Sequence, residues 1–123
     1  MNTLDIFQIC VDAAAEAGRE FLLIGGHAVN AHGYARTTTD FDFLVAGRDL
    51  RFWSDTLKAA GYQLIAQEGQ IEAFAQFQPR DEATGFRVDL MLVNEPTFAK
   101  LLAGSEWKEI GHRRVRVIGV LHL

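Results

Sequence analysis

The segment DFDF at residues 40–43 places two acidic side chains inside an apolar run, TTTDFDFLVAG. If this run is a strand, alternation sends Phe41 and Phe43 to one face and Asp40 and Asp42 to the other. Neighbouring carboxylates repel each other and raise each other's pKa unless a cation lies between them. Mg²⁺ suits such a pair, because one or two carboxylates and the phosphates of a substrate commonly hold it. The other interpretation is a solvated strand edge whose charges resist aggregation.

A third carboxylate, Asp89, lies in the middle of a second apolar run, GFRVDLMLV at residues 85–93. A charge in such a strand is costly to bury without a partner. If the two strands are neighbours, the three aspartates could hold one or two metal ions, an arrangement that activates a nucleophile and stabilises a leaving phosphate. Alternatively, Arg87 or Arg36 pairs with Asp89 in an ordinary ion pair.

Two glycines, Gly25 and Gly26, separate a strand predicted at residues 21–24 from a short helix predicted at residues 27–32. A strand, two glycines and a helix start leave backbone N–H groups where a phosphate can bind, and glycine permits close approach. The run GGHAVN lacks the later glycine of a dinucleotide-binding fingerprint and the Lys-Ser/Thr of a phosphate-binding loop. By itself, the glycine pair is most simply a tight turn.

The bulk properties indicate one ordinary globular domain spanning residues 1–123. The net charge of −4 provides no general attraction to nucleic acid or to an anionic membrane. The start of the chain does not resemble a signal peptide, and no apolar run approaches the roughly 20 residues that a membrane-spanning helix needs. The only cysteine, Cys10, excludes an internal disulfide and is most simply a small core residue. We therefore expect a cytoplasmic protein.

Hydrophobic periodicity predicts an α+β fold, with a mixed β-sheet and helices packed mainly on one face. Helices are expected at residues 3–17, 27–32, 49–60 and 95–103, and strands at residues 21–24, 41–45, 62–66, 71–78, 86–93, 107–110 and 113–118. The run PRDEATG and the glycine at position 111 are expected to form hairpin turns.

Taken together, the run GGHAVNAHGYARTTTDFDFLV and the later strand carboxylate resemble the nucleotidyltransferase signature of the DNA polymerase β superfamily. More narrowly, the string Arg-x-Thr-x-Asp-x-Asp resembles that of AbiEii-type toxins and related bacterial nucleotidyltransferases. The resemblance covers roughly residues 21–93. It implies a polymerase β-like fold and the transfer of a nucleoside monophosphate from an NTP to a hydroxyl, with pyrophosphate leaving. It also suggests the toxin of a toxin–antitoxin pair, with an antitoxin as partner.

The resemblance assigns roles to individual residues. Gly25 and Gly26 would bind the triphosphate, with His27, Arg36 and Thr38 as further nucleotide-binding candidates. Asp40 and Asp42 would bind Mg²⁺, and Asp89 would complete the metal site or act as a base. From the residues alone, a packed or solvated histidine is the favoured interpretation of His27, whereas Arg36 is equally a structural ion-pair partner. The acceptor stays open between tRNA, a protein hydroxyl and a small molecule such as an aminoglycoside.

In AbiEii-type relatives a helical region follows the sheet, whereas this sequence stops at VIGVLHL. We expect either a fragment, or a minimal domain completed by a partner or a second copy. The apolar residues 117–123 are expected at or near a homodimer contact. The alternative function is a non-catalytic module that keeps the fold for nucleotide binding or protein interaction.

Overall fold

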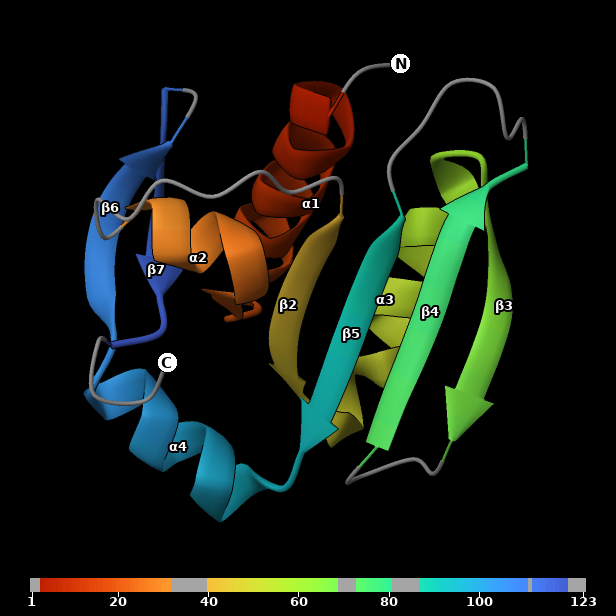
Figure 1. Ribbon diagram of the computed structural model, residues 1–123. Helices are drawn as coiled ribbons and strands as arrows, with labels where there is room; N and C mark the ends of the chain where they lie inside the picture. The colour runs from red at the N-terminus through yellow and green to blue at the C-terminus, as the bar shows by residue number, and fades with distance from the viewer. Residues whose placement is uncertain (1–2, 32–39, 69–72, 81–86, 111, 120–123) are drawn as a thin grey trace.

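A computed structural model of the protein describes residues 3–31, 40–68, 73–80, 87–110 and 112–119 (Figure 1). The helices are α1 (Thr3–Ala17), α2 (Gly25–Ala31), α3 (Leu50–Ala59) and α4 (Glu95–Ala103), and a 3₁₀ turn, η1 (Gly47–Asp49), precedes α3. The strands are β1 (Leu22–Ile24), β2 (Phe41–Ala46), β3 (Tyr62–Glu68), β4 (Ala73–Pro79), β5 (Val88–Val93), β6 (Glu106–Ile110) and β7 (Arg113–Val117).

In the described part of the chain the strands form one seven-stranded sheet in the order β3-β4-β5-β2-β1-β7-β6. β2 runs parallel to β5, and β1 runs parallel to β7. The other neighbouring strands are antiparallel. The predicted mixed sheet and α+β fold class are confirmed, including the hairpin pairing of β4 with β5 and of β6 with β7.

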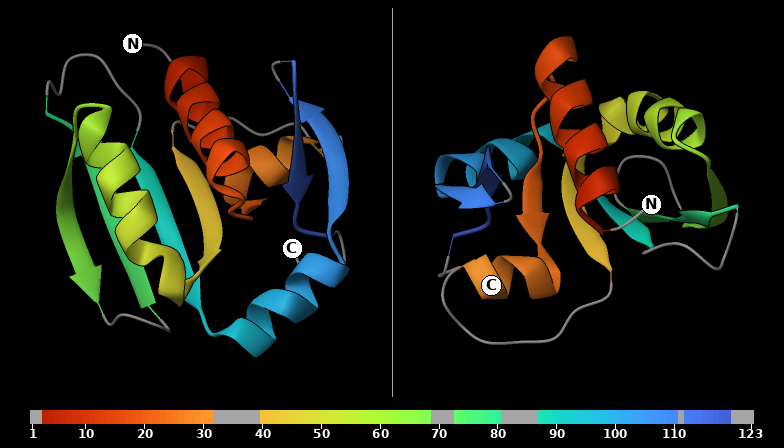
Figure 2. Two further views of the ribbon diagram at one scale, coloured as in Figure 1. Left: turned by 180° about the vertical axis from the view of Figure 1, so that it is seen from behind. Right: turned by 90° about the horizontal axis from the view of Figure 1, so that it is seen from above.

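One face of the sheet carries the main hydrophobic core beneath α1 and α3 (Figure 2). Phe41 and Phe43 of β2 both point into this core, as the alternation of DFDF predicts. The ring of Phe7 from α1 stacks on that of Phe41 with centroids 5.1 Å apart. Cys10 is also buried here, which confirms its expected role as a core residue.

The opposite face is covered unevenly. α4 packs through Phe98 on Leu22 of β1 and Leu44 of β2. α2 follows β1 directly and contacts β1 and β2. No described helix crosses this face over β3, β4 and β5, as Figure 1 shows. Because the phenylalanines of DFDF face the core, its aspartates lie on this unevenly covered side.

Two sequence predictions change in the structure. Gly25 and Gly26 were expected to precede a helix, but they form its first residues, because α2 begins at Gly25. Val117 and Ile118 were expected near a dimer contact, but both are buried within their own chain. Val117 pairs with Leu23 of β1, and the Ile118 N–H donates to the Leu23 carbonyl. Residues 120–123 lie outside the described residues, and the homodimer stays a prediction.

Candidate active site

The three predicted acids meet on the side of the sheet opposite the main core. β2 and β5 are paired so that Asp42 lies directly opposite Asp89. Asp40 precedes the first residue of β2. The side chains are only partly exposed, 31% for Asp40 and 21% for Asp89. The expected adjacency of the two carboxylate-bearing strands is therefore present.

Asp42 and Asp89 form a coupled carboxyl pair. When Asp89 carries a proton, it can donate a hydrogen bond to the Asp42 carboxylate, which favours the protonated form of Asp89. Burial raises the pKa of Asp89 to about 6; the Arg87 charge opposes this rise, and the negative charges of Asp42 and Asp40 reinforce it. A carboxyl with a pKa near 6 is mostly ionised at pH 7 and still accepts a proton more readily than an ordinary aspartate.

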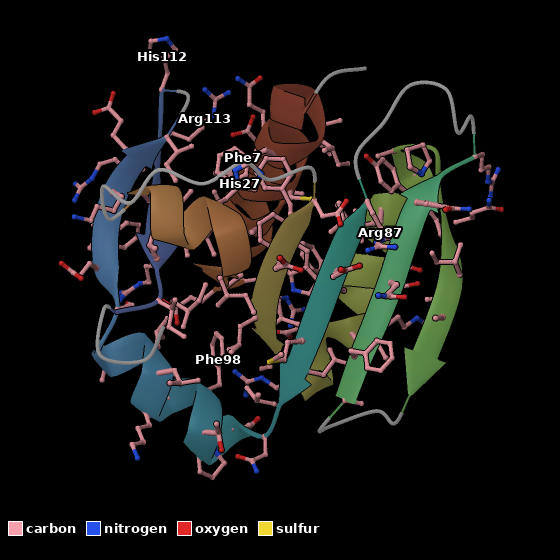
Figure 3. The ribbon with its side chains drawn as sticks, in the orientation of Figure 1. Phe7, His27, Arg87, Phe98, His112 and Arg113 are labelled. Carbon is pink, nitrogen blue, oxygen red and sulfur yellow. The ribbon has the colours of Figure 1, made fainter. Side chains whose placement is uncertain are left out.

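Arg87, labelled in Figure 3 near the start of β5, contacts two of the acids. Its Nη2 donates to Asp40 Oδ2 at 3.1 Å. Its Nε lies 3.4 Å from Asp89 Oδ1, close enough for an ion pair but without hydrogen-bond geometry. Arg87 Nε and Asp89 Oδ1 are both buried, and neither atom has a hydrogen-bond partner. The guanidinium offsets part of the negative charge and leaves one carboxylate oxygen of Asp89 unsatisfied.

Gly25 packs against the Asp42 carboxylate. Its φ of +71° lies in the left-handed region, which favours glycine. A Cβ placed on Gly25 would overlap that carboxylate and would lie only 2.9 Å from its Cγ. The sequence explained this glycine by close approach of a phosphate. The structure supplies a second reason, which is the space that Asp42 occupies.

His27 lies in α2, and its ring stacks on Phe41 with centroids 4.1 Å apart and planes at 17°. Its Nε2 is buried and has no hydrogen-bond partner. Burial lowers the pKa of His27, although the nearby charge of Asp40 opposes this shift. The imidazole is therefore neutral at pH 7. The packed interpretation describes its observed contacts, and its contact with a nucleotide stays a prediction.

These contacts determine which of the acids could hold a divalent cation. Among the described residues, no group of three or more Asp, Glu, His or Cys side chains is arranged to hold a metal ion. The pair Asp42 and Asp89 nevertheless offers adjacent carboxylates and a buried, unsatisfied Oδ1. Mg²⁺ needs only one or two protein carboxylates when substrate phosphates supply further oxygens. The pair fits such an ion, whereas Asp40 already pairs with Arg87.

Two of the predicted nucleotide-binding residues, Arg36 and Thr38, lie outside the described residues. Their proposed contacts, and an ion pair between Arg36 and Asp89, stay predictions. Sequence analysis also missed a residue, Gln76 of β4, which lies directly opposite Asp89. The alternation in AFAQFQP, with Ala75 and Phe77 in the core, was the signal that placed Gln76 on the other face.

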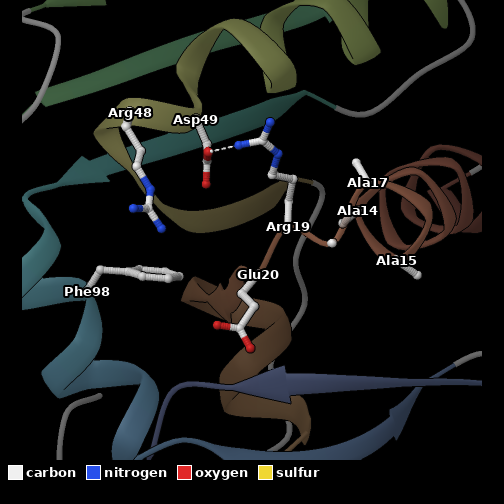
Figure 4. A pocket seen from close by; sticks show the side chains of 9 residues that line it. Ala14, Ala15, Ala17, Arg19, Glu20, Arg48, Asp49 and Phe98 are labelled. Carbon is white, nitrogen blue, oxygen red and sulfur yellow. Dashed lines mark hydrogen bonds and ion pairs between the residues drawn. The ribbon is translucent and has the colours of Figure 1, made fainter.

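Three hollows lined by described residues lie away from the acids. One has a volume of about 530 Å³ and lies between η1, α3 and β3. Another, of about 390 Å³, is shown in Figure 4 at the end of α1, beside Arg48, Phe98 and the ion pair of Arg19 with Asp49. These hollows therefore do not mark the candidate active site, which we assign from the acids themselves.

No family model and no curated protein matches the sequence. Solved structures do match the fold. The chain aligns over 97% of its length with 78% of a candidate nucleotidyltransferase from Thermotoga maritima, with a TM-score of 0.73 and 10% sequence identity. It has a nucleotidyltransferase fold of the polymerase β-like type.

Two antibiotic-modifying enzymes share this nucleotidyltransferase fold. One is ANT(2″)-Ia, solved with adenylyl-2″-tobramycin, which matches at a TM-score of 0.69 and 18% identity over 94% of this chain and 68% of its own. The other is the lincosamide adenylyltransferase LnuA, solved with lincomycin. It matches at a TM-score of 0.71 and 13% identity over 95% of this chain and 80% of its own. No helix in the described part of this chain is long and apolar enough to cross a membrane.

Proposed function

We propose that this protein is a Mg²⁺-dependent nucleotidyltransferase that moves a nucleoside monophosphate from an NTP to a hydroxyl group. The observation that carries the proposal is the adjacent pair of Asp42 and Asp89, with the backbone of Gly25 packed against the Asp42 carboxylate. These residues occupy neighbouring strands of a nucleotidyltransferase fold. The similar structures of ANT(2″)-Ia and LnuA support adenylyl transfer as the reaction class.

In this proposal, Asp42 and Asp89 would hold the ion, and the start of α2 at Gly25 and Gly26 would hold the triphosphate. When bound, Mg²⁺ supplies positive charge that neutralises the phosphates. The acceptor oxygen attacks the α-phosphorus as the bond to the β-phosphate oxygen breaks, and pyrophosphate leaves. Where Asp42 alone holds the ion, the proton of the hydroxyl passes to the carboxylate of Asp89; where Asp89 completes the metal site, the proton passes to water.

Further roles are proposed on the sequence resemblance. His27, Arg36 and Thr38 are the additional nucleotide-binding candidates, and Asp40 is a further candidate metal ligand. The resemblance to AbiEii-type toxins supports a toxin that acts in the cytoplasm with an antitoxin partner. The acceptors of ANT(2″)-Ia and LnuA instead support a small molecule.

A second candidate function is a non-catalytic module with the same fold. The observation in its favour is Arg87, because its guanidinium contacts both Asp40 and Asp89 and supplies the positive charge that a metal ion would otherwise bring. A module of this kind could bind a nucleotide or a protein partner without transferring a group.

Calorimetry with ATP, in Mg²⁺ and then in EDTA, separates the two functions. The enzyme hypothesis expects Asp42→Asn to weaken binding in Mg²⁺ by about 100-fold, because the variant loses a metal ligand. Asp12→Asn is the control, because Asp12 of α1 pairs with Arg113 of β7 and not with a residue of the candidate site. Formation of AMP and pyrophosphate should follow the same pattern. Equal ATP affinity in Mg²⁺ and EDTA, without turnover, would instead favour the module.

A further inference from the structure

A row of side chains crosses the sheet through the candidate active site. Register places Ile24 of β1 beside Asp42, Asp42 beside Asp89, and Asp89 beside Gln76 of β4. Neighbouring strands lie about 4.8 Å apart, so the row extends away from Gly25 in regular steps. At the Ile24 end α2 contacts the sheet. The Gln76 end lies on the part of the face that no described helix covers (Figure 1).

In-line displacement indicates from which end of this row the acceptor approaches. The attacking hydroxyl and the leaving pyrophosphate lie on opposite sides of the α-phosphorus. If the triphosphate lies near Gly25, the acceptor must approach from the side of Gln76. Only the β4 and β5 side of the acid pair offers open sheet surface in the described structure.

The surface there combines apolar side chains with the amides of β4. Next to the acid row, Phe74 of β4 lies opposite Met91 of β5. Met91 is 48% exposed, so its side chain is available for contact with a ligand. β4 and β5 together contain one charged residue, Asp89. Arg87, just before β5, is held by Asp40 and Asp89.

We propose that Phe74, Gln76 and Met91 form the acceptor site, and that the acceptor is a small hydroxyl compound with an apolar body and no negative charge. This inference rests on the proposed function. Phe74 and Met91 would hold the apolar body of the acceptor. Gln76 would be a positioning residue whose amide orients the hydroxyl toward Asp89. RNA does not suit the surface, because nucleic-acid affinity depends on several Lys or Arg contacts to phosphates.

The competition between water and an alcohol for the nucleotidyl group tests the site. With MgATP and benzyl alcohol as the probe, wild-type protein should form the benzyl ester of AMP as well as AMP. Met91→Gln and Gln76→Ala should each lower the ratio of ester to AMP about fivefold, through lost apolar contact or a lost hydrogen bond. Trp107→Gln is the matched control, because Trp107 is similarly exposed at 51% but lies in the distant edge strand β6.

A ratio that neither variant changes would overturn the acceptor site. Nucleotidyl transfer to a tRNA transcript, with amide shifts on β4 and β5 when the transcript is added, would overturn the inferred acceptor class. Should no protein turn over ATP, the proposed function fails separately. NMR then decides the site: benzyl alcohol shifting the amides of residues 74, 76 and 91 supports it, and unchanged spectra overturn it.

Discussion

Carboxylates near the two ends of β2 have contrasting surroundings. After the carboxyl end of the strand, Asp49 is only 4% exposed and accepts a hydrogen bond from Arg19 at 2.6 Å. Near the other end, Asp89 lies beside Asp42 with a pKa raised to about 6, and its Oδ1 lacks a hydrogen-bond partner despite Arg87 at 3.4 Å. The first arrangement satisfies a buried charge. The second arrangement leaves negative charge that a bound ligand would neutralise.

This contrast distinguishes, by their contacts, a structural carboxylate from the carboxylates that we propose are functional. A buried charge that stabilises a fold needs a close partner, because desolvation is costly. Acids that perform chemistry are commonly held in surroundings that perturb their pKa, at some cost in stability. The acid pair meets the second description and the Arg19–Asp49 pair meets the first. The following predictions test that division, from the largest expected effect to the smallest.

Gly25→Ala should cause the largest change in stability. The left-handed backbone becomes strained, and the new Cβ meets the Asp42 carboxylate. We expect a loss of about 3 kcal/mol in urea unfolding. Gly61→Ala is the control, because Gly61 also has a positive φ, of 91°, but nothing lies within 4 Å of an added Cβ. Equal losses in both variants would mean that backbone strain alone accounts for the effect.

The next test compares two matched aspartate variants. Asp49→Asn removes the ionic partner of Arg19 and should lower the free energy of unfolding by about 2 kcal/mol, a figure reduced because Arg19 is 44% exposed. Asp89→Asn should be neutral or stabilising in metal-free protein, because it removes a charge from the acid cluster. Thermal and urea unfolding measure both. If Asp89→Asn lowers the free energy of unfolding as much as Asp49→Asn does, the acid pair is structural.

Stability should also depend on pH through Asp89. Its folded pKa of about 6 exceeds the ordinary value of 3.8, so the folded state binds the proton more tightly than the unfolded state. The resulting stabilisation is fully present below about pH 4 and is lost as the pH rises through 6. Relative to Asp89→Asn, the wild-type protein should lose about 2 kcal/mol between pH 4 and pH 7 in EDTA. A constant difference across that range would contradict the raised pKa.

Arg87→Gln should have a small effect on stability and should change the affinity for Mg²⁺. Losing two partly exposed ion pairs should destabilise metal-free protein by about 1 kcal/mol. The freed carboxylates should then bind Mg²⁺ a few times more tightly, because the competing cation is gone. Calorimetric titration with Mg²⁺ measures this. Unchanged or weaker Mg²⁺ binding would favour the non-catalytic module over the enzyme.

The sequence alone determined the fold class and the faces of the site strands. Local periodicity is enough for such inferences, because side chains alternate along any strand and repeat along any helix. The runs DFDF and RVDLML therefore placed three aspartates on the face opposite the core, and the structure agrees. The boundaries of α1 and α4 agree as well, because Gly18 and Gly104 end their apolar patterns.

Only the tertiary structure decided what lies beside those aspartates. The parallel register that places Asp42 opposite Asp89, and the antiparallel register that brings Gln76 alongside, depend on pairing between strands far apart in the chain. Local pattern cannot specify such pairing. It also could not show that Asp42 lies against Gly25, or that Arg87 contacts Asp40 and Asp89 together. Electrostatic balance at a site depends on distances of a few ångströms, and packing of the whole sheet sets those distances.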